Sequence, residues 1–225
     1  MPAAGLVIAI DGPAGAGKST LSRRLAEALG LPYLNTGLMY RALTLEAVRA
    51  GIDPDDGEAL ASLARGMKFD LSSRFAPKVL LIDGELPSGA LTSTEVESHV
   101  SRVSSHPEVR VIMQDEQRRL GRGGAVIEGR DIGSVVFPDA DVKVFLLAER
   151  TERAARRSKE RDEAARAADA AAVAEALATR DARDALVSPV VPAVDAVAID
   201  TTDRDADAVF AEVLGLVRDR LAGVS

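Results

Sequence analysis

The chain has 225 residues, of which 47% are hydrophobic, and it carries a formal net charge of -7 and no cysteine. This length and hydrophobic content suffice to bury a sizeable core, so we expect one domain with appended segments. The negative charge argues against a general attraction to nucleic acid or to an anionic membrane surface. The lack of cysteine excludes disulfides, thiolate metal ligands and cysteine nucleophiles, and it is consistent with a reducing cytoplasm.

The first apolar run, at residues 6–10, is short and is followed at once by Asp11. A signal peptide would have a basic leader and a longer apolar segment. A membrane-spanning helix needs about 18 or more apolar residues. We therefore expect a cytoplasmic protein that acts as a monomer and binds neither nucleic acid nor a membrane.

Short runs rich in β-branched residues predict strands, and we place four of them at residues 6–10, 125–128, 142–147 and 196–200. Residues 33–35 are a weaker fifth candidate. Near-continuous apolar strands are typical of a parallel sheet that is covered on both faces. Helical periodicity lies between them, at residues 21–29 before Gly30 and at residues 210–221. This alternation predicts an α/β fold with a doubly wound, parallel, five-stranded sheet.

Two segments interrupt the alternation of strands and helices. Residues 67–87 have the pattern of short antiparallel strands around turns, and we expect a small insert at about residues 67–91, beside the main sheet. Residues 164–185 are rich in alanine and in charged residues, which favours an exposed helix.

Residues 12–19, Gly-Pro-Ala-Gly-Ala-Gly-Lys-Ser, fit the phosphate-loop pattern G-x-x-x-x-G-K-[ST] between a predicted strand and a predicted helix. In such a loop, backbone N–H groups and the N-terminus of the following helix surround phosphate oxygens. Lys18 would reach the terminal phosphates, and Ser19 would offer a hydroxyl to Mg²⁺. A turn that only packs strand against helix has no use for these two residues. The predicted phosphate contacts are Gly12, Pro13, Ala14, Gly15, Ala16, Gly17, Lys18, Ser19 and Thr20.

A phosphate loop occurs in switch GTPases, in ATP-driven machines and in small-molecule kinases. The sequence lacks the N-K-x-D segment that binds guanine, and a motor ATPase would be larger or visibly modular. A small-molecule kinase needs a second pocket. Residues 35–41, Asn-Thr-Gly-Leu-Met-Tyr-Arg, follow the predicted 33–35 strand and begin a helix that carries Arg41, whose guanidinium can hold a phosphate bidentately.

The segment E-G-R-D-I-G-S-V-V-F-P-D-A at residues 128–140 follows a predicted strand at its carboxyl end, where open α/β sheets place ligands. It brings Glu128, Arg130 and Asp131 into one turn. The alternative interpretation is a surface turn with a local Arg-Asp pair.

Together with R-D-A-R-D at residues 180–184, these segments resemble those of the bacterial cytidylate kinases in order and separation, over nearly the whole chain. The stretch G-R-D-[IM]-G-[ST]-V-V-F-P is much more specific than the phosphate loop. The resemblance implies transfer of the γ-phosphoryl group of ATP to CMP or dCMP, with Mg²⁺ as cofactor, in pyrimidine nucleotide metabolism. It also implies a P-loop kinase fold in which residues 1–225 form one domain with a lid at about residues 150–165.

The resemblance implies a role for each side chain of the acceptor site. Asp131 would accept a hydrogen bond from the exocyclic amine of cytosine, where uracil has a carbonyl oxygen instead. Ser101 and Arg110 would contact the O2 and N3 edge of the ring. The other implied contacts are Thr36 at the base, Arg41 and Arg130 at the phosphate, and Arg180 and Asp184 at the sugar.

The acceptor in this reaction is a phosphate that is largely ionised at neutral pH, so no general base is needed. Catalysis then depends on positioning and on cations that stabilise the transferred charge. The predicted catalytic cations are Lys18, Arg130, Arg153 and Arg157, the last two on the lid. A solvated helix face is the alternative for these lid arginines. Glu128 would hold Mg²⁺ through water, beside Ser19, and the two histidines are interpreted as surface or helix-end residues: His99 and His106.

Two positions depart from the family pattern. Asn35 stands where many relatives have aspartate, and Val187 stands where relatives often have arginine. These departures put acceptor affinity in question. Two other functions remain open at this stage: a kinase for a different small acceptor, and a nucleotide-gated binding module without catalysis.

Overall fold

The computed structural model describes residues 5–159 and 191–223, with side chains for 5–156 and 191–223. Its centre is a five-stranded sheet in the order β2-β5-β1-β6-β7, and each neighbouring pair is parallel. The predicted α/β class and the parallel sheet are therefore confirmed, including the weak strand at residues 33–35. The strands are β1 (Val7–Asp11), β2 (Tyr33–Asn35), β5 (Ala125–Gly129), β6 (Val142–Leu147) and β7 (Val197–Asp200).

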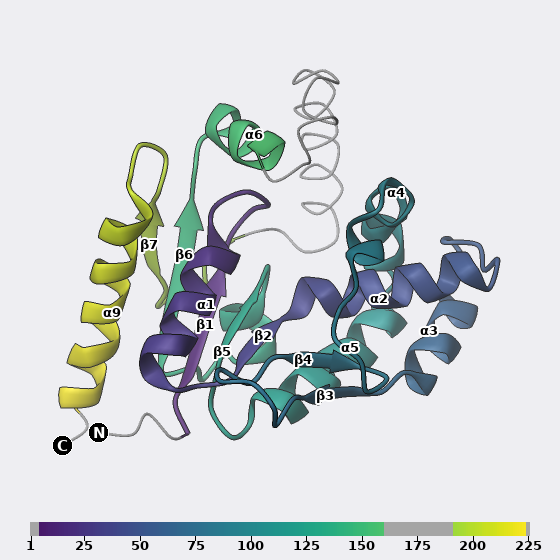
Figure 1. The fold of residues 1–225 in the computed structure, drawn as a ribbon, viewed down its shortest axis with the longest axis horizontal. Coiled ribbons are helices and arrows are strands. Elements are labelled where there is room, and N and C mark those ends of the chain that lie inside the picture. Colours follow the sequence, from purple (N-terminus) through teal and green to yellow (C-terminus); the bar gives the residue numbers. More distant parts are fainter. Residues whose placement is uncertain (1–4, 160–190, 224–225) are drawn as a thin grey trace.

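The two faces of the sheet bury alternate residues of β1. Ile8 and Ile10 pack with helices α1 (Lys18–Leu29) and α9 (Ala206–Ala222). Ala9 packs in a second cluster with residues of α2 (Thr36–Arg49), α3 (Gly57–Gly66), α4 (Thr94–Val103) and α5 (Pro107–Gly121). Helices on both faces make the sheet doubly wound, and Figure 1 shows α9 on one side and α2 to α5 on the other.

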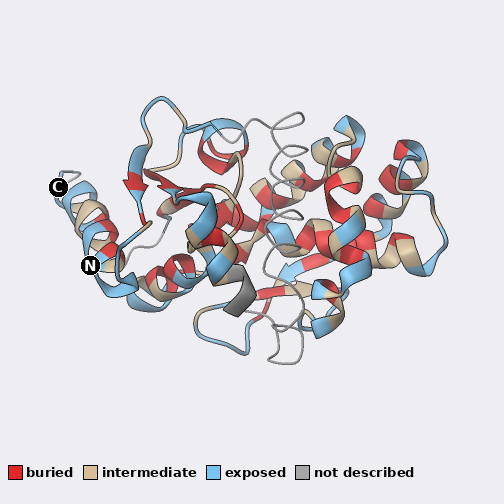
Figure 2. Cartoon of the chain, turned by 90° about the horizontal axis from the view of Figure 1, so that it is seen from above, coloured by how far each residue is buried: buried red, intermediate tan, exposed pale blue. Residues whose placement is uncertain are grey.

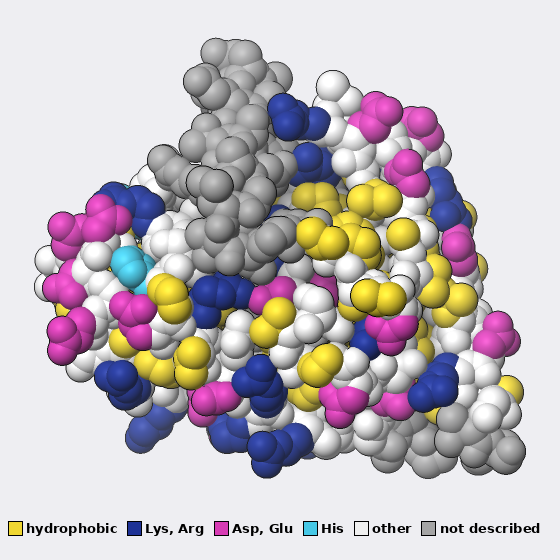
Figure 3. All heavy atoms as spheres, turned by 180° about the vertical axis from the view of Figure 1, so that it is seen from behind, with side chains coloured by type: hydrophobic (Ala, Val, Ile, Leu, Met, Phe, Trp, Pro, Cys, Tyr) yellow, Lys and Arg dark blue, Asp and Glu magenta, His cyan; other side chains and the backbone are white. Residues whose placement is uncertain are grey.

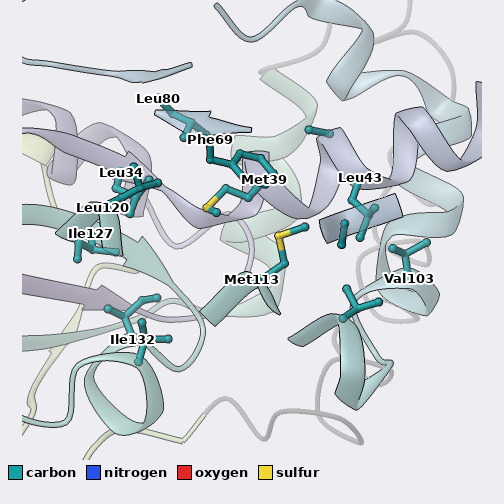
Figure 4. Packing of buried hydrophobic residues seen from close by; sticks show 14 of the residues in the cluster. Leu34, Met39, Leu43, Phe69, Leu80, Val103, Met113, Leu120, Ile127 and Ile132 are labelled. Carbon is teal, nitrogen blue, oxygen red and sulfur yellow. The ribbon is translucent and has the colours of Figure 1, made fainter. Parts of the chain in front are cut away.

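The larger cluster is built from buried side chains of several elements (Figure 4). Met39 of α2 and Met113 of α5 lie between Ile127 of β5 and Leu43, farther along α2. Buried residues follow the strands and the inner faces of the helices (Figure 2). This packing fixes the starts of α2 and α5 relative to the sheet, and with them the polar side chains described below.

Residues of the predicted insert form a two-stranded antiparallel sheet, β3 (Phe69–Leu71) paired with β4 (Leu80–Ile82). The backbone N–H of Tyr33 donates to the carbonyl oxygen of Lys78 at 2.8 Å. The insert thereby covers the edge strand β2, whose outer backbone groups would otherwise be unpaired. A short 3-10 helix, η1 (Gly89–Thr92), then leads into α4.

Two further elements follow strands at the carboxyl edge of the sheet. A π-helical turn, η2 (Ile132–Val136), follows β5, and α6 (Arg150–Lys159) follows β6. The helix expected at residues 164–185 and the end of the expected lid lie outside the described residues. Among the helices that are described, none has the length and apolarity to cross a membrane. On the described part of the face in Figure 3, acidic and basic side chains are interspersed.

Candidate nucleotide-binding site

A cavity of about 220 Å³ lies at the carboxyl edge of the sheet, between the phosphate loop and helices α2, α4 and α5. The register brings the ends of three strands together there, since Asp11 pairs with Gly129 and Asn35 with Glu128. The cavity therefore contains residues of both the phosphate loop and the predicted second pocket. The predicted residues that line it are Ala14, Gly15, Gly17, Lys18, Ser19, Thr20, Thr36, Arg41, Arg110, Glu128, Arg130 and Asp131.

The phosphate loop has the backbone that its glycines predict. Gly15 has a φ of +78°, and a Cβ there would lie 2.9 Å from the carbonyl oxygen of Arg153. A side chain at this position would meet both backbone strain and a steric clash. The Lys18 ammonium donates to the carbonyl oxygens of Gly12 at 2.8 Å and Pro13 at 2.7 Å. The loop and its lysine thus form one compact unit at the N-terminus of α1.

Glu128 is 3% exposed and is the most deeply buried acid of the site. Its Oε1 accepts hydrogen bonds from Ser19 Oγ at 2.8 Å and from the Tyr33 hydroxyl at 2.7 Å. Burial raises the pKa of Glu128, while Lys18 and the two hydrogen bonds oppose the rise. Burial beside this carboxylate also raises the pKa of Tyr33. Tyr33 was not predicted as a site residue, because it lies 95 positions from Glu128.

The oxygen atoms of Glu128 and Ser19 fit Mg²⁺. The second carboxylate oxygen, Glu128 Oε2, is buried without a hydrogen-bond partner among the described residues. The hydroxyl of Ser19 lies beside the same carboxylate. A hard divalent cation prefers such oxygen ligands and keeps several waters and phosphate oxygens of its own.

The two groups predicted to recognise the base lie side by side. Arg110 of α5 and Asp131 form an ion pair, and both side chains are largely buried. Arg110 also donates to the carbonyl oxygen of Ser104 at 3.4 Å. Ser101 is buried in α4 but does not line the cavity, whereas Val100 of that helix and Ser104, the residue at its C-terminal cap, do. Sequence reasoning missed Ser104, which lies one helical turn beyond the predicted serine.

Arg41 of α2 lines the cavity and is only 7% exposed. Its guanidinium donates to the carbonyl oxygen of Leu91 at 2.9 Å and to Glu97 of α4 at 2.5 Å. The hydroxyl of Thr36 donates to the carbonyl oxygen of Glu128 at 2.7 Å, which ties the start of α2 to β5. The contact with Glu97 was not predicted, since nothing in the sequence around that glutamate indicates a site.

Asn35 replaces the expected aspartate and uses both ends of its amide. Its oxygen accepts from the backbone N–H of Leu38 at 3.2 Å and so caps α2. Its Nδ2 donates to the Tyr33 hydroxyl at 3.3 Å. An ionised aspartate could cap the helix but could not donate to Tyr33.

Arg153 lies against the phosphate loop and is 7% exposed. It donates to the carbonyl oxygens of Ala14 and Ala148, both at 3.1 Å. The alternative of a solvated helix face is therefore wrong for Arg153. Arg156, which was not predicted, donates to the carbonyl oxygen of Thr201 at 2.6 Å. Three predicted residues of the phosphate loop do not line the cavity: Gly12, Pro13 and Ala16. Three further predicted residues lie outside the described side chains: Arg157, Arg180 and Asp184.

Comparisons with known proteins agree with these motifs. A family model described as cytidylate kinase matches residues 8–219. The chain is 49% identical over 150 residues to a bifunctional pantoate ligase/cytidylate kinase of Gloeobacter violaceus. The aligned residues cover 65% of this chain and 29% of that protein. It is 48% identical over 148 residues to a cytidylate kinase of Syntrophotalea carbinolica, with 65% and 63% covered.

A cytidylate kinase of Chloroflexus aggregans is 49% identical over 150 residues, which cover 64% of this chain and 65% of that one. The chain therefore spans less than two thirds of the length of each of these relatives. The family match nevertheless extends over all but the ends of the chain. The chain belongs to the cytidylate kinase family.

Proposed function

We propose that the protein transfers the γ-phosphoryl group of ATP to CMP or dCMP and so forms ADP and CDP or dCDP. The observation that carries this proposal is that residues of the phosphate loop and the Arg110-Asp131 pair line one and the same cavity. A cavity with a phosphate loop alone would serve any nucleotide hydrolase. The second set of polar groups supplies a place for an acceptor nucleotide.

In this proposal the donor phosphates bind along the phosphate loop, where glycine backbone N–H groups and the N-terminus of α1 attract anions. Lys18, whose ammonium donates to carbonyl oxygens of the loop, would contact the terminal phosphates of the donor. Bound Mg²⁺ would be held by Ser19 and, through water, by Glu128, and it would neutralise charge on the phosphates.

The acceptor base would lie against Asp131 and Arg110. Cytosine presents an amine donor next to two acceptors, so a carboxylate and a guanidinium held side by side match its edge. Uracil would turn a carbonyl oxygen toward the Asp131 carboxylate, so that two hydrogen-bond acceptors face each other and the hydrogen bond from the base is lost, which costs about 1 to 3 kcal/mol or more for a charged group. The other proposed acceptor contacts are Thr36 and Ser101 at the base, Arg41 and Arg130 at the phosphate, and Arg180 and Asp184 at the sugar.

The chemical step is an in-line transfer. An oxygen of the acceptor phosphate forms a bond to the γ-phosphorus, and the bond from that phosphorus to the β–γ bridging oxygen breaks. Since the attacking oxygen is already ionised, the residues need only orient the phosphates and offset negative charge. Lys18, Arg130, Arg153 and Arg157 are the proposed cations. A lid at about residues 150–165 would close over the donor and exclude water from the reaction.

We further propose that residues 1–225 act as one domain, with the insert at about 67–91 on the acceptor side, and as a cytoplasmic monomer. The reaction itself is tested by incubating the protein with Mg²⁺, ATP and CMP and separating the nucleotides by ion-exchange chromatography. We expect CDP and ADP in equal amounts, and no ADP without an acceptor. A nucleotide-gated binding module would give no ADP that depends on CMP.

A further inference from the structure

Asp11, the last residue of β1, uses both carboxylate oxygens on the loop that follows β5. Oδ1 accepts from the backbone N–H of Ile132 at 2.8 Å, and Oδ2 accepts from that of Gly133 at 2.7 Å. Asp11 is 6% exposed and is not part of the cavity wall. It acts therefore on the two residues that come directly after Asp131, and not on a ligand.

These two N–H groups are the first of the η2 turn. The first N–H groups of a helix have no acceptor within the helix and need one from elsewhere. The residue at the N-cap position is Asp131, a type that commonly caps with its own side chain. Here Asp131 makes no such capping bond, and its carboxylate pairs with Arg110 in the cavity wall. Asp11, at the end of the neighbouring strand β1, accepts from the first N–H groups of the turn in place of Asp131. The carboxylate of Asp131 is therefore left to pair with Arg110 at the proposed acceptor site.

The arrangement has an electrostatic cost that a neutral residue would avoid. Burial raises the pKa of Asp11 to about 6, and the nearby charge of Asp131 adds to the rise, although the two N–H groups and Lys18 oppose it. A carboxylate is the one side chain of this size that can accept from two adjacent N–H groups at once without donating. The chemistry of Asp11 thus matches its two backbone partners.

We propose that Asp11 is a positioning residue for acceptor recognition, which fixes Arg130 and Asp131 in the cavity by holding the backbone of Ile132 and Gly133. This inference rests on the proposed function, because it takes the acceptor-binding role of Asp131 as given. It goes beyond that function in assigning part of the choice of base to a residue that touches no substrate.

The test is the substitution Asp11→Asn. The amide keeps the shape of the side chain but presents an NH₂ group to one of the two backbone donors, so the turn loses one anchor. We expect the KM for CMP to rise by about tenfold, the KM for ATP to change by less than about threefold, and the preference for CMP over UMP to fall by about tenfold.

Asp141→Asn is the matched control. Asp141 also accepts from a backbone N–H of β1, that of Val7 at 2.9 Å, but at the opposite end of the strand. We expect it to lower the melting temperature without changing the CMP/UMP preference. If Asp11→Asn does not fold, Asp11→Ser gives the same comparison, since its shorter side chain withdraws the acceptors from the turn without placing an NH₂ group opposite a backbone N–H group.

The outcomes separate the two proposals. Suppose that the wild-type enzyme prefers CMP. If Asp11→Asn then keeps the full preference, or raises the KM for CMP and the KM for ATP equally, the positioning role of Asp11 is overturned and the proposed function stands. Failure of the wild-type protein to prefer CMP would instead overturn the proposed function. A variant that loses the preference while Asp141→Asn keeps it supports the inference.

Discussion

Arg110 of α5 and Asp131 of the turn after β5 form an ion pair inside the cavity, although 21 residues separate them in the chain. Each charge has its counter-charge beside it, which lowers the cost of keeping both largely buried. The pair also places an acceptor and a donor of hydrogen bonds next to each other. That order is complementary to the amine and ring nitrogen of cytosine.

Asp131→Ala should reduce kcat/KM for CMP by about 10-fold to 100-fold, because it removes a charged hydrogen-bond acceptor from the base and leaves Arg110 without this counter-charge. The expected loss for UMP is smaller, since uracil offers no donor at that position. Steady-state kinetics with both acceptors measures the difference. Asp115→Ala, at an exposed position of α5 paired with Arg118, is the control and should change neither value. Equal losses for CMP and UMP would contradict the role of Asp131.

Lys18→Ala should lower kcat by at least about 100-fold, since it removes a cation from the phosphates in the transition state. The fold should remain, because Lys18 is only half-buried at the edge of the cavity and its two described hydrogen bonds go to backbone carbonyl oxygens of Gly12 and Pro13, not to the core. Circular dichroism and the ADP-release assay together check this. Retained activity in the folded variant would count against the assignment of the phosphate loop to ATP.

Arg41→Ala should raise the KM for CMP by about tenfold or more, with a smaller effect on the KM for ATP, because a charged contact with the acceptor phosphate is lost. Arg49→Ala is a suitable control, as Arg49 lies on the same helix, is exposed and pairs with Glu46. The result to watch for is a larger effect on the KM for ATP than on that for CMP, which would place Arg41 on the donor side.

The raised pKa of Asp11 predicts how stability depends on pH. The carboxyl ionises near pH 6 in the folded protein and near 3.8 in an unfolded chain. Between these values the folded state holds more protons, so the contribution of Asp11 to the free energy of unfolding falls as pH rises from about 4 to above 6, by up to about 3 kcal/mol. Urea unfolding of the wild-type protein and Asp11→Asn at several pH values isolates this contribution. If the difference in the free energy of unfolding between the two proteins stays constant with pH, folding does not raise the pKa of Asp11.

Local pattern predicted most of the regular structure. Residues 142–147 form β6 as expected, and α1 ends at Leu29, followed by the cap residue Gly30, whose φ of +67° lies in the left-handed region that glycine tolerates. The strand order did not follow from the sequence, since it depends on which strands pair across long loops. The π-helical turn after Asp131 was also not predicted, because its first N–H groups are held by Asp11, 121 and 122 residues away.

The same limit applies to the site. The segments that the motifs singled out line one cavity, since the carboxyl ends of parallel strands meet at one edge. The residues that hold those side chains in place were missed. Tyr33 bonds Glu128 and Glu97 bonds Arg41 through tertiary contacts that leave no local pattern in the sequence. Such supporting contacts require the fold to be known first.

The choice of acceptor base tests the central proposal most directly. The measurement is kcat/KM for CMP, dCMP, UMP and AMP with the wild-type protein, at one concentration of Mg²⁺ and ATP, by coupled ADP release. We predict that CMP and dCMP exceed UMP and AMP by at least about tenfold, which is the discrimination expected when a buried hydrogen-bonding group is left unpaired by the wrong base. Equal values for CMP and UMP would contradict it.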